Sequence, residues 1–219
     1  MWNFLVAGGP FMLLLVLTSL VSVTFIVERG LALRRRRVVP GELETLLAEC
    51  RGRDDLPLVQ SACEKEPSTL SRLVLTAAAH LGWSKDDNVN ALQTRARQEL
   101  VLLERGLVVL EVVVGVAPLL GLLGTIHGLT ILFGDMGQAG VSDNAVLARG
   151  IAIALNTTMM GLLIAIPSLV AWSYYTKKVE TFAVELESLL DDFLRRVYRK
   201  PATPRRRGKT ARETAGPAK

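Results

Sequence analysis

The chain has few of the residues on which most enzymes and metal proteins depend. It contains only two histidines and two cysteines in 219 residues. Cys50 and Cys63 have no nearby histidine, so they do not form the ligand set of a zinc site. No nucleophile–base set and no phosphate-binding loop is evident. The sequence therefore predicts a protein that is not an enzyme and that has no cofactor and no bound metal.

Charged residues are also missing from the middle of two long apolar stretches, from about Val112 to Phe133 and from about Gly150 to Ala171. A third apolar stretch runs from about Phe11 to Val27. A helix needs roughly 20 apolar residues to cross ~30 Å of hydrocarbon. Half of all residues are hydrophobic, and neither an internal repeat nor a strand pattern is evident. The predicted fold is an all-α membrane protein with three transmembrane helices.

Basic residues predict the orientation of these helices. Arg29 and Arg34 to Arg37 follow the first stretch, and Lys177 and Lys178 follow the third. The segment 135–146 holds acids but no lysine or arginine. Because basic loops face the cytoplasm, the N-terminus is predicted outside and the C-terminus inside. A basic run after the apolar core, with no charge before it, also argues against a cleaved signal peptide.

The chain is thus predicted to consist of segments with distinct roles. In order, they are a first transmembrane helix with an outer N-terminus (1–30), a cytoplasmic helical region (31–105), a second transmembrane helix (106–134), an outer loop (135–146), a third transmembrane helix (147–176), a cytoplasmic amphipathic helix (177–199) and a disordered basic tail (200–219). The cytoplasmic location of the two cysteines indicates reduced thiols. For the tail, attraction to anionic lipid headgroups is favoured over binding of nucleic acid.

Spans two and three are both predicted to extend as long helices into the cytoplasm. A helix is expected to begin near Ser84, with acids in its first turn, and to run without a break into the second span. Beyond the third span, apolar residues recur at the spacing of a helix-packing seam. They are Val179, Phe182, Leu186, Leu189, Phe193 and Val197.

Small residues recur at intervals of three and four along both of these spans, so they share one face of each helix. On the second span they are Gly121, Gly124, Thr125 and Gly128, and on the third they are Ala154, Thr158, Gly161 and Ala165. Small residues let membrane helices approach closely. The two faces are therefore predicted to pack against helices.

The polar groups within the spans are few. Thr125 lies in the second span, and Asn156, Thr157 and Thr158 lie in the third. The two helices run in opposite directions, which places Thr125 and Thr158 at one level, ~12 Å below the outer surface. The hydroxyls could bond their own backbone at i−4, but the matching depth and the adjoining small faces favour a shared polar lining. His127 is interpreted as a neutral packing residue.

Two charged residues flank the spans. Glu111 lies at the inner edge of the second span and Arg149 at the outer edge of the third. Both are interpreted as interface anchors and not as proton relays.

Two motifs resemble the signature of the ExbB/TolQ/MotA proton-channel family. Residues 117–125 read Ala-Pro-Leu-Leu-Gly-Leu-Leu-Gly-Thr, and residues 150–167 read Gly-Ile-Ala-x-Ala-Leu-x-x-Thr-x-x-Gly-Leu-x-x-Ala-Ile-Pro. Pro118 and Pro167, inside these motifs, are interpreted as structural. Leu-Glu-Arg-Gly-Leu at 103–107 and the Gly-Gly-Pro opening also fit. Three spans fit the ExbB and TolQ branches, whereas MotA has four.

The resemblance implies a homopentameric ring in the bacterial inner membrane, with spans two and three lining its pore. A single-span partner similar to ExbD or TolR would bring a membrane aspartate, and proton flow would drive a protein similar to TonB or TolA. By the same resemblance, Thr125 and Thr158 would be the pore hydroxyls that face the aspartate. Asn156 and Thr157 would add polar groups nearby.

One departure from the family pattern opens an alternative. The family often has glutamate in the Gly-Ile-x-Glu-Ala-Leu run, where this chain has Ile153. An apolar residue cannot relay a proton. A non-conducting scaffold ring derived from the same family is therefore the second hypothesis. A small-solute transporter is disfavoured because three spans without inverted repeats do not build the usual binding site.

Overall fold

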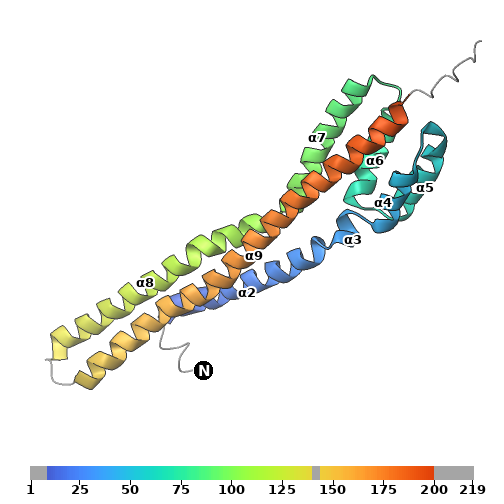
Figure 1. Ribbon diagram of the computed structural model, residues 1–219. Helices are drawn as coiled ribbons and strands as arrows, with labels where there is room; N and C mark the ends of the chain where they lie inside the picture. Colours follow the sequence, from blue (N-terminus) through green and yellow to red (C-terminus); the bar gives the residue numbers. More distant parts are fainter. Residues whose placement is uncertain (1–8, 140–143, 200–219) are drawn as a thin grey trace, which may run out of the picture.

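The computed structural model describes residues 9–139 and 144–199, and Figure 1 shows them as an elongated bundle of helices. The elements are α2 (Gly9–Ala32), α3 (Arg35–Val38), α4 (Gly41–Glu49), the 3-10 helix η1 (Arg53–Asp55), α5 (Leu56–Lys65), α6 (Thr69–Ala79), α7 (Lys85–Glu104), α8 (Leu107–Ala139) and α9 (Asn144–Tyr198). No strand occurs in this described part of the chain. The predicted outer N-terminal residues 1–8 and the predicted basic tail lie outside it.

Three helices are long and apolar enough to cross a membrane. The candidate spans are Pro10–Ala32 in α2, Leu107–Gly134 in α8 and Gly150–Tyr198 in α9. The three helices lie side by side at one end of the molecule, and α9 continues to the other end as one helix of 55 residues. The predicted all-α fold with three transmembrane helices and a long third helix is confirmed. Pro118 and Pro167 lie inside α8 and α9 without ending them.

The segment predicted as an outer loop, 135–146, is shorter as a connection in the structure. Helix α8 continues to Ala139 and α9 begins at Asn144. No proline interrupts this segment, so nothing in the backbone forces the helices to end earlier. Residues 140–143 lie outside the described residues, as does the side chain of Arg149.

The chain breaks between α7 and α8, where one continuous helix was expected. Gly106 has φ +91°, a conformation that is strained for any residue with a side chain. Its Cα faces α2, and a Cβ added there would lie 3.2 Å from Nε of Arg29 and 3.3 Å from Cδ1 of Phe25. The second span is therefore joined to α7 through a bend at Gly106, whereas the third span continues without a break.

Two hydrogen bonds join α2 to α9. The hydroxyls of Ser22 and Ser168 are 2.6 Å apart and buried, and the Tyr175 hydroxyl donates to the carbonyl of Ile26 at 2.9 Å. In an apolar environment such contacts satisfy groups that would otherwise be unpaired. They fix the register of the first span against the third.

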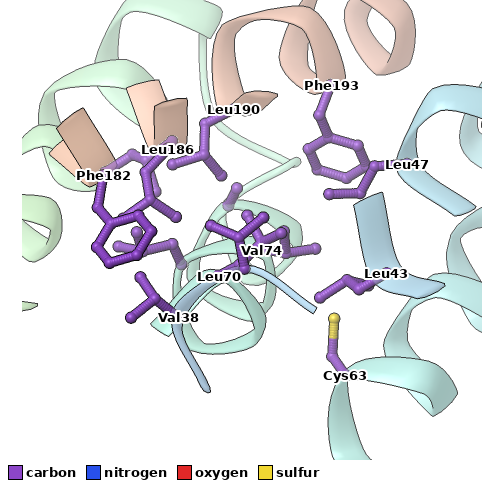
Figure 2. Close-up of a cluster of buried hydrophobic side chains, with 14 of the residues drawn as sticks. Val38, Leu43, Leu47, Cys63, Leu70, Val74, Phe182, Leu186, Leu190 and Phe193 are labelled. Atoms are coloured by element: carbon purple, nitrogen blue, oxygen red, sulfur yellow. The ribbon is translucent and has the colours of Figure 1, made fainter. Parts of the chain in front are cut away.

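The remaining helices gather around the C-terminal part of α9 and form a second hydrophobic core with it, separate from the contacts among the three candidate spans. Figure 2 shows α9 side chains pointing toward α6 and α4, with Cys63 of α5 at the edge. The predicted seam is buried at Val179, Phe182, Leu186, Phe193 and Val197. Leu189 is only partly buried, and Leu190 occupies the core in its place. A straight helix repeats every 3.6 residues, so the buried stripe drifts from a strict seven-residue repeat.

The starts of α6 and α7 are capped as their sequences indicate. The Ser84 hydroxyl accepts a hydrogen bond from the backbone N–H of Asp87, which confirms the predicted helix start. The Ser68 hydroxyl accepts from the N–H of Ser71 in the same way. These bonds satisfy amides that have no partner within the helix.

A buried carboxylate ties α6 to α7. The Glu99 side chain is 1% exposed, and Arg72 donates to it from Nε at 2.9 Å and from Nη2 at 2.6 Å. Arg95, one turn earlier on α7, lies 2.8 Å away through Nη2. Two guanidinium groups thus compensate for taking one carboxylate out of water, which a single exposed pair would not do.

Both cysteines are free and buried in the second core. Burial raises the pKa of the Cys63 thiol to about 11 and also raises the pKa of Cys50. Since the thiolate is the reactive form, a raised pKa makes a thiol inert near neutral pH.

A Cys50→Ser variant, which leaves Cys63 as the only cysteine, should be alkylated slowly by iodoacetamide at pH 8. Raising the pKa from 9.0 to about 11 lowers the thiolate fraction about a hundredfold. The alkylation rate should rise steeply as the pH approaches 11. In denaturant it should equal the rate of an exposed cysteine thiol. Equal rates for the folded and the denatured protein at pH 8 would contradict the burial of this thiol.

The backbones of α8 and α9 come together along their small faces. A Cβ added to Gly161 would lie 2.6 Å from the carbonyl oxygen of Ala117, and one added to Gly121 would lie 2.9 Å from that of Thr157. Such distances leave no room for a side chain. The predicted small-residue faces therefore pack against each other, with Gly124 and Gly128 also against α9 and with Ala154 and Ala165 buried.

Gly161→Ala is expected to lower the melting temperature of the protein in detergent, because the added methyl meets backbone and forces the helices apart. Overpacking of this kind costs about 1–3 kcal/mol. Gly115→Ala is the matched control, since a Cβ on Gly115 meets nothing within 4 Å. Circular dichroism during heating gives both values. Equal melting temperatures for the two variants would show that the close approach does not stabilise the bundle.

Candidate functional site

Three threonine hydroxyls meet between α8 and α9, in the membrane-spanning part of the molecule. The Thr125 hydroxyl is in direct hydrogen-bond contact with that of Thr158 and lies 3.3 Å from that of Thr157. The depth argument placed Thr125 and Thr158 at one level, and the structure brings their side chains together. The hydroxyls therefore form one cluster that joins the two helices.

Two backbone carbonyl oxygens complete this cluster. The Gly121 oxygen accepts from Thr125 at 3.2 Å, from Thr157 at 3.1 Å and from Thr158 at 3.2 Å. The Ala154 oxygen accepts from Thr157 at 2.7 Å and from Thr125 at 3.0 Å. Thr125 thus reaches its own backbone at i−4 and also the facing helix.

Glycine at 121 makes this geometry possible. A Cβ on Gly121 would lie 3.0 Å from the Cα of Thr158. Any side chain would push α9 away from the Gly121 carbonyl, and the hydroxyls of Thr157 and Thr158 would lose that acceptor. The small residues of the packing face therefore also set the distances within the hydroxyl cluster.

The three threonines differ in exposure. Thr125 and Thr158 are partly exposed, whereas Thr157 is 1% exposed and lies in the interface between the helices. Asn156 is half-buried, one helix step from Thr157, and among the described residues it makes no hydrogen bond to the three threonines. A group that approaches the cluster from another molecule would thus meet Thr125 and Thr158 before Thr157.

Few titratable side chains accompany this cluster. Residues 112–133 and 150–171 contain no Asp, Glu, Lys or Arg. His127 is exposed, and its ring lies edge-on to Phe11 of α2, with centroids 5.4 Å apart. Ile153 is half-buried. Over the described residues no group of three or more His, Cys, Asp or Glu is arranged to hold a metal ion.

Two features of the site were not found from the sequence. The first is the role of the Gly121 carbonyl as a common acceptor, since backbone groups carry no signal in a residue pattern. The second is the buried Ser22–Ser168 pair. The first span holds several hydroxyls, Thr18, Ser19, Ser22 and Thr24, and nothing in its sequence indicates which of them faces Ser168.

Comparison with known proteins places the chain in a family. A sequence model described as the MotA/TolQ/ExbB proton channel family matches residues 65–188, more than half of the chain. The match runs from the end of α5 through α8 and into α9 as far as residue 188, so it includes all three threonines.

Named relatives agree with this match. The biopolymer transport protein ExbB-like 3 of Synechocystis sp. is 32% identical over 177 residues, covering 74% of this chain and 79% of the relative. ExbB-like 1 of Synechocystis sp. is 28% identical over 204 residues, covering 90% and 80%. ExbB of Helicobacter pylori is 37% identical over 81 residues, covering 37% of this chain and 56% of that relative.

The chain thus spans little more than half the length of the Helicobacter relative, and most of the Synechocystis ones. Its three apolar helices agree with a membrane protein of the ExbB/TolQ type. Because the family model matches more than half of the chain and ExbB-like 3 of Synechocystis sp. is matched over 79% of its length, the chain belongs to the MotA/TolQ/ExbB proton channel family.

Proposed function

We propose that the chain is an ExbB/TolQ-like subunit of a bacterial inner-membrane proton channel, which converts proton-motive force into mechanical work on an envelope partner. The observation that supports this most is the hydroxyl pair of Thr125 and Thr158, partly exposed on two adjacent spans. A hydroxyl donates to a carboxylate and accepts from a carboxylic acid. The pair is therefore suited to a titrating carboxyl group in both protonation states.

The titrating group would come from a second protein. Residues 112–133 and 150–171 of the second and third spans contain no carboxylate, and a hydroxyl does not hold an extra proton near neutral pH. A single-span partner of the ExbD/TolR kind, with an aspartate in its span, supplies the missing chemistry. In a homopentameric ring, with α8 and α9 lining the pore, five hydroxyl pairs would surround that aspartate.

The orientation belongs to the same proposal. With the N-terminus outside and the C-terminus in the cytoplasm, the hydroxyl cluster lies toward the outer half of the membrane and the second core lies in the cytoplasm. The envelope partner would be a protein of the TonB or TolA kind. Transport of biopolymers is the activity in the names of the relatives, and energy for such transport is the proposed output.

A second candidate function has one observation in its favour. Ile153 stands where the family often has glutamate, and it is half-buried and precedes Ala154 in the chain. A ring that has lost this acid could be a non-conducting scaffold. The two candidates differ in whether a carboxylate-bearing partner accompanies the chain.

Affinity purification of the chain from its native membrane in a mild detergent, read by mass spectrometry, separates the candidates. Recovery of a single-span protein with an aspartate in its span supports the proton channel. Recovery of a ring alone, in several detergents, supports the scaffold. Native mass spectrometry of the same sample gives the number of copies in the ring.

Thr158→Val should reduce proton flux through the purified complex by about tenfold or more, since it removes one hydrogen bond to an ionised group. Proton uptake into liposomes, followed with a pH-sensitive dye inside them, measures the flux. Thr130→Val is the control, because the Thr130 hydroxyl is exposed and bonds only its own helix at Ile126. Unchanged flux in Thr158→Val would remove Thr158 from the ion pathway.

A further inference from the structure

The hydroxyl cluster contains more acceptors than one arrangement of its hydrogens uses. Three hydroxyl hydrogens, on Thr125, Thr157 and Thr158, face the carbonyl oxygens of Gly121 and Ala154. Hydroxyl hydrogens rotate freely about the C–O bond. The heavy-atom distances therefore permit two complete arrangements with no movement of either helix.

In the first arrangement Thr157 donates to Ala154 at 2.7 Å, and Thr158 donates to Gly121 at 3.2 Å. Thr125 then donates to the hydroxyl oxygen of Thr158. All three hydrogens are used within the cluster. The lone pairs of Thr125 stay available, so the cluster accepts a hydrogen bond from outside and offers none.

In the second arrangement Thr157 donates to Gly121 at 3.1 Å, and Thr125 donates to Ala154 at 3.0 Å. Both carbonyl oxygens still receive one hydroxyl hydrogen each. The Thr158 hydrogen is now unused within the cluster and is available to a group outside it. The cluster has changed from an acceptor to a donor by rotation of three hydroxyls, and no O–H bond has broken.

We propose that Thr157 is a positioning residue that lets the Thr125–Thr158 pair switch between accepting from a carboxylic acid and donating to a carboxylate. It does this by moving its own hydrogen from Ala154 to Gly121, which replaces the hydrogen that Thr158 withdraws. This inference rests on the proposed function, because the carboxyl group belongs to the partner's span. It adds a residue that never touches that carboxyl group.

The location of Thr157 fits this role and not that of a pore residue. Its side chain is 1% exposed and is held against Gly124, where an added Cβ would lie 2.9 Å from its hydroxyl oxygen and 3.0 Å from its Cβ. Among the residues that the structure describes, the hydrogen-bond partners of this hydroxyl are the two carbonyls and Thr125. Without the Thr157 hydrogen, Thr125 alone would have to serve both carbonyls whenever Thr158 donates outward.

Thr157→Ser and Thr157→Ala form the matched pair that tests this inference. Both lack the methyl group of threonine, so they lose the same packing, and only serine keeps the hydroxyl. The complex of the chain with its co-purified single-span partner is prepared for each variant and for the wild type. Proton flux into liposomes is divided by the amount of assembled complex, and melting temperatures are recorded.

Thr157→Ser should conduct within about twofold of the wild type, and Thr157→Ala should conduct about fivefold less than Thr157→Ser, as expected for one ordinary hydrogen bond. Equal flux in the two variants, with a conducting wild type, would overturn the role of Thr157 and leave the proposed function intact. A wild-type complex that does not conduct would instead overturn the proposed function. A purely packing role predicts equal loss in both variants, because serine does not restore the methyl.

Discussion

The contact on which the site depends is the backbone approach of α8 to α9 at two glycines. Gly161 admits the carbonyl of Ala117, and Gly121 admits the backbone of Thr157 and Thr158. In lipid there is little hydrophobic drive between helices, so association depends on packing and polar contacts. At Gly121 both arise at the same place, because the glycine that permits packing also exposes its carbonyl to the facing hydroxyls of Thr157 and Thr158. A side chain at Gly121 would weaken both at once.

Helix α9 links this contact to the part of the molecule beyond the candidate spans. Helix α9 is continuous over 55 residues, and beyond the membrane it supplies one wall of the second core. Arg196 near its end donates to the carbonyls of Leu47 and Ala48, at the end of α4. The second span is instead jointed at Gly106, against Phe25 and Arg29 of α2. Displacement of α9 would thus reach the helices of the second core directly, whereas displacement of α8 would be absorbed at the bend.

The sequence predicted the features of this structure that follow from helical periodicity. It did not predict the features that depend on contacts between helices. The facing small residues and the common level of Thr125 and Thr158 follow from rise and repeat alone, and Ser84 as a cap follows from local chemistry. The break at Gly106 does not, because a glycine inside a helical pattern becomes a joint only when another helix packs on it. Leu190 in place of Leu189, and the Ser22–Ser168 pair, depend on the register between helices, which the sequence of one helix does not contain.

The absence of a carboxylate at position 153 has a consequence for the proposed channel. A pathway lined by hydroxyls and backbone carbonyls offers hydrogen bonds but no site that takes up a proton near neutral pH. A ring of this chain alone would therefore offer a proton no carboxyl group at the level of Thr125 and Thr158. Conduction would require the partner's carboxyl group at the level of Thr125 and Thr158, so unassembled rings would not dissipate the proton gradient. On this argument Ile153 does not oppose a channel: it makes conduction depend on the partner.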